Sequence, residues 1–199
     1  NSSLLMKFKI FKLKRVTSTN DVAMKLIQKE KKEIGFVYAE TQTKGRGSQG
    51  KLWVSEKGNF FGTIFFQLKK NYPTFDEFSI INPVIISDVI ENYCKGKKIS
   101  FKWPNDIFVN EKKICGILQE VITVENKNFL IIGIGINVLS NPKIDTKYKT
   151  TSILKESNKK PQIELLVKKM ALSYESFFIN LALYDFINFK KKAESMALN

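Results

Sequence analysis

The spacing of apolar residues along the chain predicts a series of β-strands. Over Met6–Arg15, apolar side chains alternate with Lys, which is the pattern of a strand with one buried face. Asn110 and Glu111 separate two later apolar runs and predict a tight hairpin turn. The other predicted strands are Gly35–Glu40, Asn59–Leu68, Ile99–Trp103, Ile107–Val109, Lys112–Val124 and Phe129–Val138.

Apolar side chains at helical spacing predict the helices. Thr17–Asn20 offers side chains that can cap a first helix, which would continue through Ile27. Phe75–Cys94 has the length and periodicity of a buried helix, with Pro83 as a kink or an early boundary. Two further helices are predicted over Gln162–Leu183 and from Asp185 onward.

This order of elements predicts the α+β class, with a mixed, largely antiparallel sheet flanked by helices. The sequence has no internal repeat, no low-complexity segment and no clean domain boundary. We therefore expect a single domain over residues 1–199, with Ser140–Thr151 as a surface loop.

Length and composition fit a cytoplasmic protein without a membrane partner. Hydrophobic residues make up 43% of the 199 residues and charged residues 26%, which is ordinary for one globular domain. No apolar stretch approaches the roughly 20 residues that span a bilayer, and no signal-peptide pattern is present. Cys94 and Cys115 lack a paired spacing, so we expect no disulfide framework. Met6 resembles an initiator, in which case Asn1–Leu5 is a non-native remnant.

The formal net charge of +14 is the feature that favours a nucleic-acid-binding module. Arg15 and Arg46 are the only Arg among the 33 basic residues, and the Lys residues are scattered through all predicted elements. Nucleic-acid-binding proteins usually concentrate charge on one face and read bases with Arg. We therefore expect no specific nucleic-acid partner, although the charge would attract an acidic protein.

The absence of histidine excludes several kinds of site. Ser-His-Asp catalysis, Cys-His catalysis and His-based metal sites are all ruled out. A catalytic site would have to use Lys, Arg, carboxylates, hydroxyls and backbone amides, with carboxylate-bound Mg²⁺ as the expected metal.

Rare residue types gather in the polar segment Thr41–Gly58, which is too long for a simple turn. Gly45, Gly47 and Gly50 lie there with Arg46. An Arg in a Lys-rich chain suggests bidentate binding of phosphate or carboxylate, and closely spaced Gly lets backbone amides approach an anion. By itself, the segment fits a flexible hairpin with a surface Arg equally well.

Five segments together resemble the biotin protein ligase family in sequence and in order. Gly45–Trp53 is similar to the family's GRGRxGRxW loop, and Lys102–Asp106 reads KWPND. Lys113–Glu120 matches K-[IL]-x-G-I-L-x-E, Gly133–Asn137 matches GxGxN, and Ser18–Asn20 is the family's STN. The resemblance covers nearly the whole chain and implies the catalytic domain shared by biotin ligases and class II aminoacyl-tRNA synthetases.

The resemblance implies two half-reactions. Biotin and ATP give biotinyl-adenylate and pyrophosphate, and a lysine of a biotin carboxyl carrier domain then takes the biotinyl group. The implied substrates are therefore biotin and ATP, with Mg²⁺ as the metal and the carrier domain of a carboxylase as the protein partner.

The resemblance also implies the site residues. Lys113 and Arg46 would be catalytic, because their charge offsets repulsion between the biotin carboxylate and the α-phosphate. Trp53 and Gly116 would form walls, and Gly133 would leave room for the biotin ring. The implied biotin-binding residues are Ser18, Thr19, Gln42, Gly45, Arg46, Trp53, Lys113, Gly116 and Gly133. Those implied for ATP or the adenylate are Arg46, Lys51, Trp53, Asn105, Asp106, Lys113 and Asn137, with Asp106 as the Mg²⁺ ligand.

Most of these residues also have a purely structural interpretation. Ser18 and Thr19 are good helix caps, and Trp53 could belong to the core. Asp106 would readily form an Asx turn after a proline, and Lys113 outside the motif would be one solvated lysine among many.

The sequence departs from the family at three places. Ser48 stands where the family usually has a second arginine that helps to retain the adenylate. No segment of helix-turn-helix size precedes the first strand, so we expect a monofunctional ligase and not a repressor. The family's small C-terminal β-barrel has no room after Ala193–Asn199, which would affect efficiency more than identity.

Other functions remain as alternatives. A lipoate ligase or related acyltransferase shares the fold class, but it would be expected to carry an RRxGGG-type loop. An inactive biotin-binding or scaffold protein is a third possibility beside the nucleic-acid-binding module. The sequence leaves the oligomeric state open, including a homodimer.

We predict that Ser48→Arg retains biotinyl-adenylate better than the wild-type protein. A charge-assisted contact is worth roughly 1.5–3 kcal/mol, so release should fall about tenfold or more. Release of the intermediate and non-specific lysine biotinylation measure the leak. Equal leakage from the two proteins would show that the idea is wrong, for example because Lys44 or Lys51 compensates.

Overall fold

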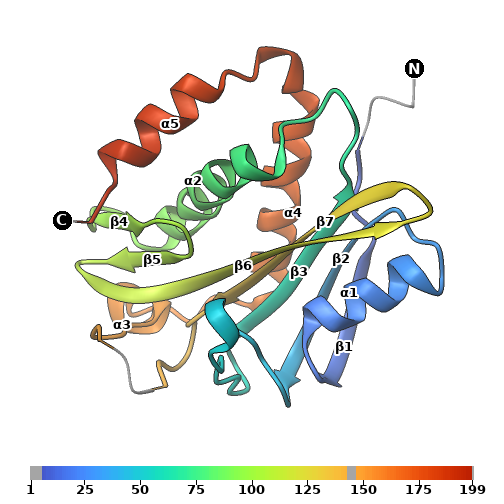
Figure 1. Cartoon of the computed structure of the whole chain (residues 1–199). Helices are drawn as coiled ribbons and strands as arrows, with labels where there is room; N and C mark the ends of the chain where they lie inside the picture. The colour runs from blue at the N-terminus through green and yellow to red at the C-terminus, as the bar shows by residue number, and fades with distance from the viewer. Residues whose placement is uncertain (1–5, 143–146, 199) are drawn as a thin grey trace.

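The computed structural model describes residues 6–142 and 147–198. In this part of the chain, one sheet has the strand order β1-β2-β3-β7-β6-β5-β4 (Figure 1). β1 and β2 are parallel and the other neighbouring strands are antiparallel, which confirms the predicted mixed, largely antiparallel sheet. The strands are β1 (Ile10–Val16), β2 (Ile34–Gln42), β3 (Phe60–Gln67), β4 (Ile99–Lys102), β5 (Asp106–Val109), β6 (Lys112–Val124) and β7 (Lys127–Ile136).

Helices lie on both faces of the sheet (Figure 1). α1 (Thr19–Gln28) packs against β2, β3 and β7. α2 (Phe75–Tyr93) packs on the opposite face, where it contacts all three later helices. The later helices are α3 (Ile153–Ser157), α4 (Ile163–Ile179) and α5 (Phe186–Ser195).

The alternation of side chains along the strands creates two cores. On β3, Ile64 and Phe66 belong to the larger core under α2 and α4, whereas Phe65 belongs to the smaller core under α1. On β7, Ile132 and Ile134 likewise face the larger core. Gly133, which lies between them, therefore faces the α1 side. Because α1 has only ten residues, it leaves part of that face to other segments.

Most predicted elements are confirmed, with shifted ends. The turn at Asn110 and Glu111 has φ of 48° and 65°, as a tight hairpin turn requires. β1 begins at Ile10, four residues after the predicted start at Met6. The predicted helix over Gln162–Leu183 ends at Ile179, before a short 3-10 turn.

Of the two alternatives predicted for Pro83, the early boundary is wrong, and one helix was not predicted. Pro83 does not end α2, which continues from Phe75 to Tyr93 because burial of its apolar residues outweighs one lost backbone hydrogen bond. The helix α3 was not predicted, because five residues are too short for a clear period, although Ser152 caps it through the backbone N of Lys155.

Some expectations fall outside the described residues. These are the proposed remnant at residues 1–5 and part of the loop over Ser140–Thr151, of which residues 143–146 are not described. Both Cys94 and Cys115 are free and buried, as the lack of paired spacing predicted.

Among the described helices, none is both long enough and apolar enough to cross a membrane.

We predict that Asn82→Ala destabilises the fold by about 1–3 kcal/mol, because it leaves buried polar partners unpaired. The side chain of Asn82 accepts a hydrogen bond from the Tyr174 hydroxyl (2.8 Å) and donates one to Gln119 Oε1 (2.7 Å). Urea unfolding measures the change. Glu91→Ala, at an exposed position of the same helix, should change stability by less than about 0.5 kcal/mol. Equal effects of the two variants would contradict this role of Asn82.

Candidate active site

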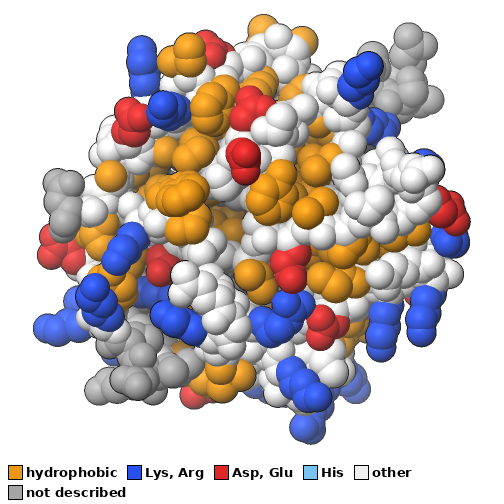
Figure 2. Space-filling model, in the orientation of Figure 1, with side chains coloured by type: hydrophobic (Ala, Val, Ile, Leu, Met, Phe, Trp, Pro, Cys, Tyr) orange, Lys and Arg blue, Asp and Glu red, His pale blue; other side chains and the backbone are white. Residues whose placement is uncertain are grey.

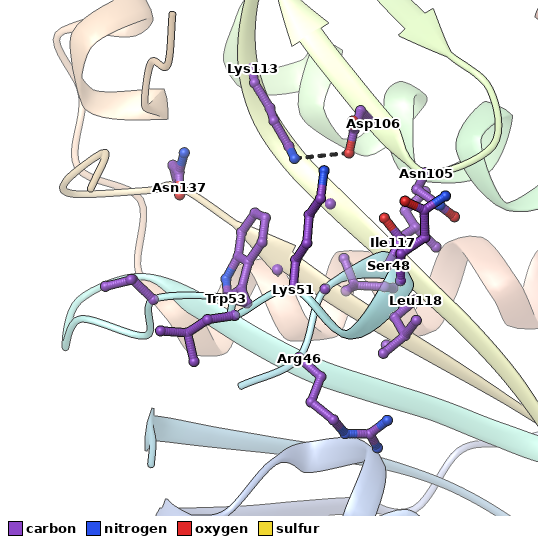
Figure 3. Close-up of a pocket in the computed structure, with 18 of the residues that line it drawn as sticks. Arg46, Ser48, Lys51, Trp53, Asn105, Asp106, Lys113, Ile117, Leu118 and Asn137 are labelled. Carbon is purple, nitrogen blue, oxygen red and sulfur yellow. Dashed lines mark ion pairs between the residues drawn. The ribbon is translucent and has the colours of Figure 1, made fainter. Parts of the chain in front are cut away.

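A cavity of about 630 Å³ opens on the α1 side of the sheet, a size typical of small-molecule sites. Its walls come from the start of α1, the loop of residues 45–53, and β6 and β7 near their glycines (Figure 3). The predicted site residues that line it are Ser18, Thr19, Gln42, Arg46, Lys51, Trp53, Asn105, Asp106, Lys113, Gly116, Gly133 and Asn137.

The indole ring of Trp53 lies on glycines of two paired strands. Gly116 of β6 is the partner of Gly135 of β7. A Cβ atom at Gly116 would lie 2.6 Å from Cζ3 of Trp53, and one at Gly135 would lie 2.5 Å from Cε2. The structure thus brings Trp53 and Gly116 together as a wall, and Gly135 is a further member that the sequence analysis did not name.

One end of the cavity is rich in hydrogen-bonding groups. Gln42 Oε1 accepts a hydrogen bond from the backbone N of Thr19 at 2.9 Å, and Gln42 Nε2 donates one to Ser55 Oγ at 2.9 Å. Thr63 is buried and does not line the cavity, but its hydroxyl lies 2.7 Å from that of Thr19 and 2.6 Å from Asn20 Oδ1. This end can therefore hold a small polar ring by directional hydrogen bonds.

Ser18 has the structural role that its residue type suggests. Its Oγ accepts a hydrogen bond from the backbone N of Asp21 at 3.1 Å and so caps α1. Because Ser18 also lines the cavity, capping and a ligand contact are compatible.

Gly133 lines the cavity and also lies against the start of α1. A Cβ atom at this position would lie 2.5 Å from Oδ1 of Asn20. The buried amide of Asn20 therefore lies where a side chain at Gly133 would be, and the room for a biotin ring beside Gly133 stays a prediction. Glycine is required here because the start of α1 approaches β7 closely.

The loop of residues 45–53 folds into a narrow hairpin with a turn at Ser48–Gly50. The backbone N of Trp53 donates to the carbonyl of Gly45 at 2.9 Å. Gly45 does not line the cavity, and its predicted contact with biotin stays a prediction. A Cβ atom there would lie 2.5 Å from the backbone O of Trp53, so this glycine lets the two arms of the hairpin approach each other.

Arg46 forms ion pairs with two carboxylates. Its Nη2 lies 2.9 Å from Asp21 Oδ1 in the first turn of α1, and its Nη1 lies 3.1 Å from Glu120 Oε2 on β6. The hydrogen bond to Glu120 raises the pKa of the guanidinium, although burial opposes the shift. In this conformation the charge of Arg46 is directed at carboxylates, so the predicted phosphate contact would need a rearrangement.

Lys113 carries its charge into the other end of the cavity. Its Nζ lies 2.9 Å from Asp106 Oδ1 and 5.5 Å from the centre of the Trp53 ring. Figure 3 shows the Lys51 ammonium directed toward the same ion pair, whereas the guanidinium of Arg46 points away from it. Two lysines therefore bring positive charge to one end of the cavity.

A β-bulge explains how Lys113 reaches the cavity. Ile107 is paired with Cys115, but its neighbour Phe108 is paired with Lys113, so Ile114 is an extra residue on β6. Ile114 and Cys115 both face the larger core as a result. The bulge reverses the alternation and places Lys113 on the same face as Gly116. Without it, Lys113 would point to the opposite side of the sheet.

Asn105 and Asn137 line the same end but have structural bonds of their own. The carbonyl of Asn105 accepts a hydrogen bond from Ile117 N at 2.8 Å. The buried Asn137 side chain donates to the carbonyl of Thr151 at 3.1 Å. Both bonds fix the backbone next to Lys113 and Asp106.

The residues fit Mg²⁺ only together with a phosphate ligand. Within residues 6–142 and 147–198, no three His, Cys, Asp or Glu side chains are grouped to hold a metal ion. Mg²⁺ commonly binds through one or two carboxylates plus substrate phosphates, and Asp106 offers one carboxylate on the cavity wall.

Sequence reasoning missed several residues that shape this site. Asn20, Gly135 and Glu120 lie inside the motifs already quoted, so the pattern contained them without giving them a role. Thr63 lies in no motif, and its pairing with Gly133 across β3 and β7 brings it to Thr19 and Asn20, which line the cavity.

The sequence matches the Biotin/lipoate A/B protein ligase family over residues 12–137. It is 30% identical over 189 residues to the Bifunctional ligase/repressor BirA of Bacillus subtilis, covering 92% of this chain and 58% of that protein. It is 31% identical over 132 residues to the Biotin--[acetyl-CoA-carboxylase] ligase of Paracoccus denitrificans, covering 65% and 55%. The chain thus spans less than two thirds of the length of these relatives.

The fold is similar to that of the biotin protein ligase of Leishmania major, solved in complex with biotinyl-5-AMP. The TM-score is 0.81 at 26% identity, and the alignment covers 96% of this chain and 81% of that one. The family match spans more than half of the described residues, and the fold agrees with it. The chain therefore belongs to the Biotin/lipoate A/B protein ligase family.

Proposed function

We propose that this chain is a biotin protein ligase, which activates biotin with ATP and transfers it to a lysine of a biotin carboxyl carrier domain. The observation that carries the proposal is a cavity with two different ends. Gln42 and Thr19 offer hydrogen bonds at one end, and Lys113 lies beside Asp106 at the other. The first end suits the ureido ring of biotin, and the second suits a carboxylate and phosphates.

In the first step, an oxygen of the biotin carboxylate attacks the α-phosphorus of ATP. The bond from this phosphorus to the bridging oxygen breaks, pyrophosphate leaves, and biotinyl-adenylate forms. Both reactants are anions, so the ammonium groups of Lys113 and Lys51 would offset their repulsion. Arg46 would have to leave Asp21 and Glu120 to take its predicted place beside the phosphate.

In the second step, the uncharged amine of the carrier lysine attacks the carbonyl carbon of the mixed anhydride. The bond from this carbon to the phosphate oxygen breaks, AMP leaves, and the amine loses a proton as the amide forms. The hairpin of residues 45–53 would exclude water from the anhydride until the carrier arrives. Trp53, Asn105 and Asn137 would border the nucleotide.

Asp106 is the residue that would hold Mg²⁺, together with oxygens of ATP. When bound, the ion would neutralise negative charge on the departing pyrophosphate. Asp106 also holds Lys113 at 2.9 Å, so one carboxylate would orient both the lysine and the nucleotide.

An acidic carrier domain of a carboxylase is the partner that the charge favours. The net charge of +14 would attract such a domain, and one relative is named as an acetyl-CoA-carboxylase ligase. Figure 2 shows Lys and Arg side chains at several edges of one face with Asp and Glu among them. This interspersed charge gives no support on that face to a nucleic-acid-binding function.

A lipoate ligase is the alternative within the same family. The dithiolane ring of lipoate has no group that hydrogen-bonds as a urea does. The polar end formed by Thr19 and Gln42, which Ser55 and Thr63 support by hydrogen bonds, therefore favours biotin over lipoate.

We predict exchange of pyrophosphate into ATP that depends on biotin and is not supported by lipoate. Lys113→Ala should lower the exchange rate about 100-fold or more, because one charge that stabilises the transition state is lost. Lys112→Ala, at the exposed neighbouring position, should leave the rate within about twofold. A folded wild-type protein without biotin-dependent exchange would defeat the proposed function.

A further inference from the structure

A continuous series of polar contacts connects the hairpin of residues 45–53 with the hydrogen-bonding end of the cavity. Each contact is within hydrogen-bonding distance, and the members come from α1, β2, β3, β6 and the hairpin itself. In order along the series, they are Arg46, Glu120, Asn20, Thr63, Thr19 and Gln42.

The position of Glu120 is fixed by contacts through both carboxylate oxygens. Oε2 accepts from Arg46 at 3.1 Å, and Oε1 accepts from the Asn20 amide at 2.8 Å. Asn20 is itself buried, and its Oδ1 is 2.6 Å from the hydroxyl of Thr63. A surface ion pair between two flexible side chains would have no such support. Glu120 is therefore a fixed point of attachment for Arg46.

The second carboxylate is fixed in a similar way. Asp21 lies in the first turn of α1, and its other oxygen, Oδ2, is 3.2 Å from the hydroxyl of Thr17. The two carboxylates flank the guanidinium, which can bind both at once because it presents several N–H groups in one plane. The side chains of Arg46, Asp21 and Glu120 keep only 36%, 37% and 27% of their exposure.

We infer that Asp21 and Glu120 are positioning residues, which hold Arg46 and thereby keep the hairpin of residues 45–53 over the cavity. Asn20 connects this attachment to the residues proposed to bind the ureido ring. The attachment itself follows from the contacts, and its effect on ATP rests on the proposed function. Lys51 and Lys113 are then the cations that face the phosphates, and Arg46 acts through the loop that carries Lys51.

This role and a direct phosphate role of Arg46 predict opposite results when Glu120 loses its charge. If the carboxylates compete with phosphate for Arg46, then releasing Arg46 strengthens ATP binding. If they hold the hairpin in place, then releasing Arg46 loosens the hairpin and weakens ATP binding.

The experiment is Glu120→Gln in the full chain, since Gln can still accept the hydrogen bond from Asn20. Limited trypsin digestion, followed by mass spectrometry, measures cleavage after Lys44 and Lys51 in the hairpin. We expect cleavage about three- to tenfold faster than in the wild type, with an unchanged unfolding midpoint. We also expect the KM for ATP to rise about three- to tenfold, with kcat within about twofold.

Two further variants make the result specific. Glu125→Gln is the control. Glu125 directly follows β6 and its exposed carboxylate pairs with Lys31, so its loss should change neither the rate of cleavage nor the KM for ATP. Arg46→Lys keeps the charge but cannot bind two carboxylates in one plane, so it should loosen the hairpin as Glu120→Gln does. If both single variants act by breaking the contact between Arg46 and Glu120, trypsin should cleave the double variant Arg46→Lys/Glu120→Gln no faster than the more quickly cleaved single variant.

The outcomes separate this inference from the proposed function. Unchanged cleavage in both Glu120→Gln and Arg46→Lys, or a lower KM for ATP in Glu120→Gln, would overturn the positioning role. Faster cleavage in a protein without biotin-dependent exchange would leave the positioning role standing and remove only the proposed reaction. If Glu120→Gln does not fold, Arg46→Lys gives the same test.

Discussion

Three glycines on one face of the β6–β7 pair are the constraint on which the cavity depends. Gly116 and Gly135 are paired across the two strands, and the Trp53 ring occupies the space above them. Gly133 leaves the corresponding space to Asn20. A side chain at any of the three positions would displace the ring or the start of α1. The opposite face of the same strands carries large apolar residues, so one pair of strands completes the core and shapes the cavity.

Lys113 and Arg46 are positioned by two different features of the backbone. A β-bulge at Ile114 brings Lys113 to the cavity face, where Asp106 and Trp53 hold its ammonium group. Arg46 is brought by the hairpin to Asp21 and Glu120. The first arrangement leaves a cation beside the space for a ligand. The second binds a cation to carboxylates, which suits the attachment of a loop better than the binding of a further anion.

The sequence predicted the elements that have a clear period and the segments that carry rare residues. It could not predict contacts that depend on pairing between distant strands. The register of β3 against β7 brings Thr63 to Gly133, and the bulge on β6 has no local sequence signature. For the same reason the motif gave no role to Asn20, whose amide lies where a side chain at Gly133 would be. Pro83 shows the converse, because tertiary packing overrode a local preference.

Almost all other basic residues of the chain are lysine, and the structure explains why position 46 is an arginine. A Lys ammonium could approach Asp21 or Glu120, but its compact charge does not span two carboxylates on separate elements. The planar guanidinium does so with bonds of 2.9 and 3.1 Å. This arrangement requires that both carboxylates are held in place. Asn20 holds Glu120 by a hydrogen bond, and the cap of α1 fixes the backbone of Asp21. A phosphate, by contrast, can be bound by the point charge of a lysine, and two lysines lie at the other end of the cavity.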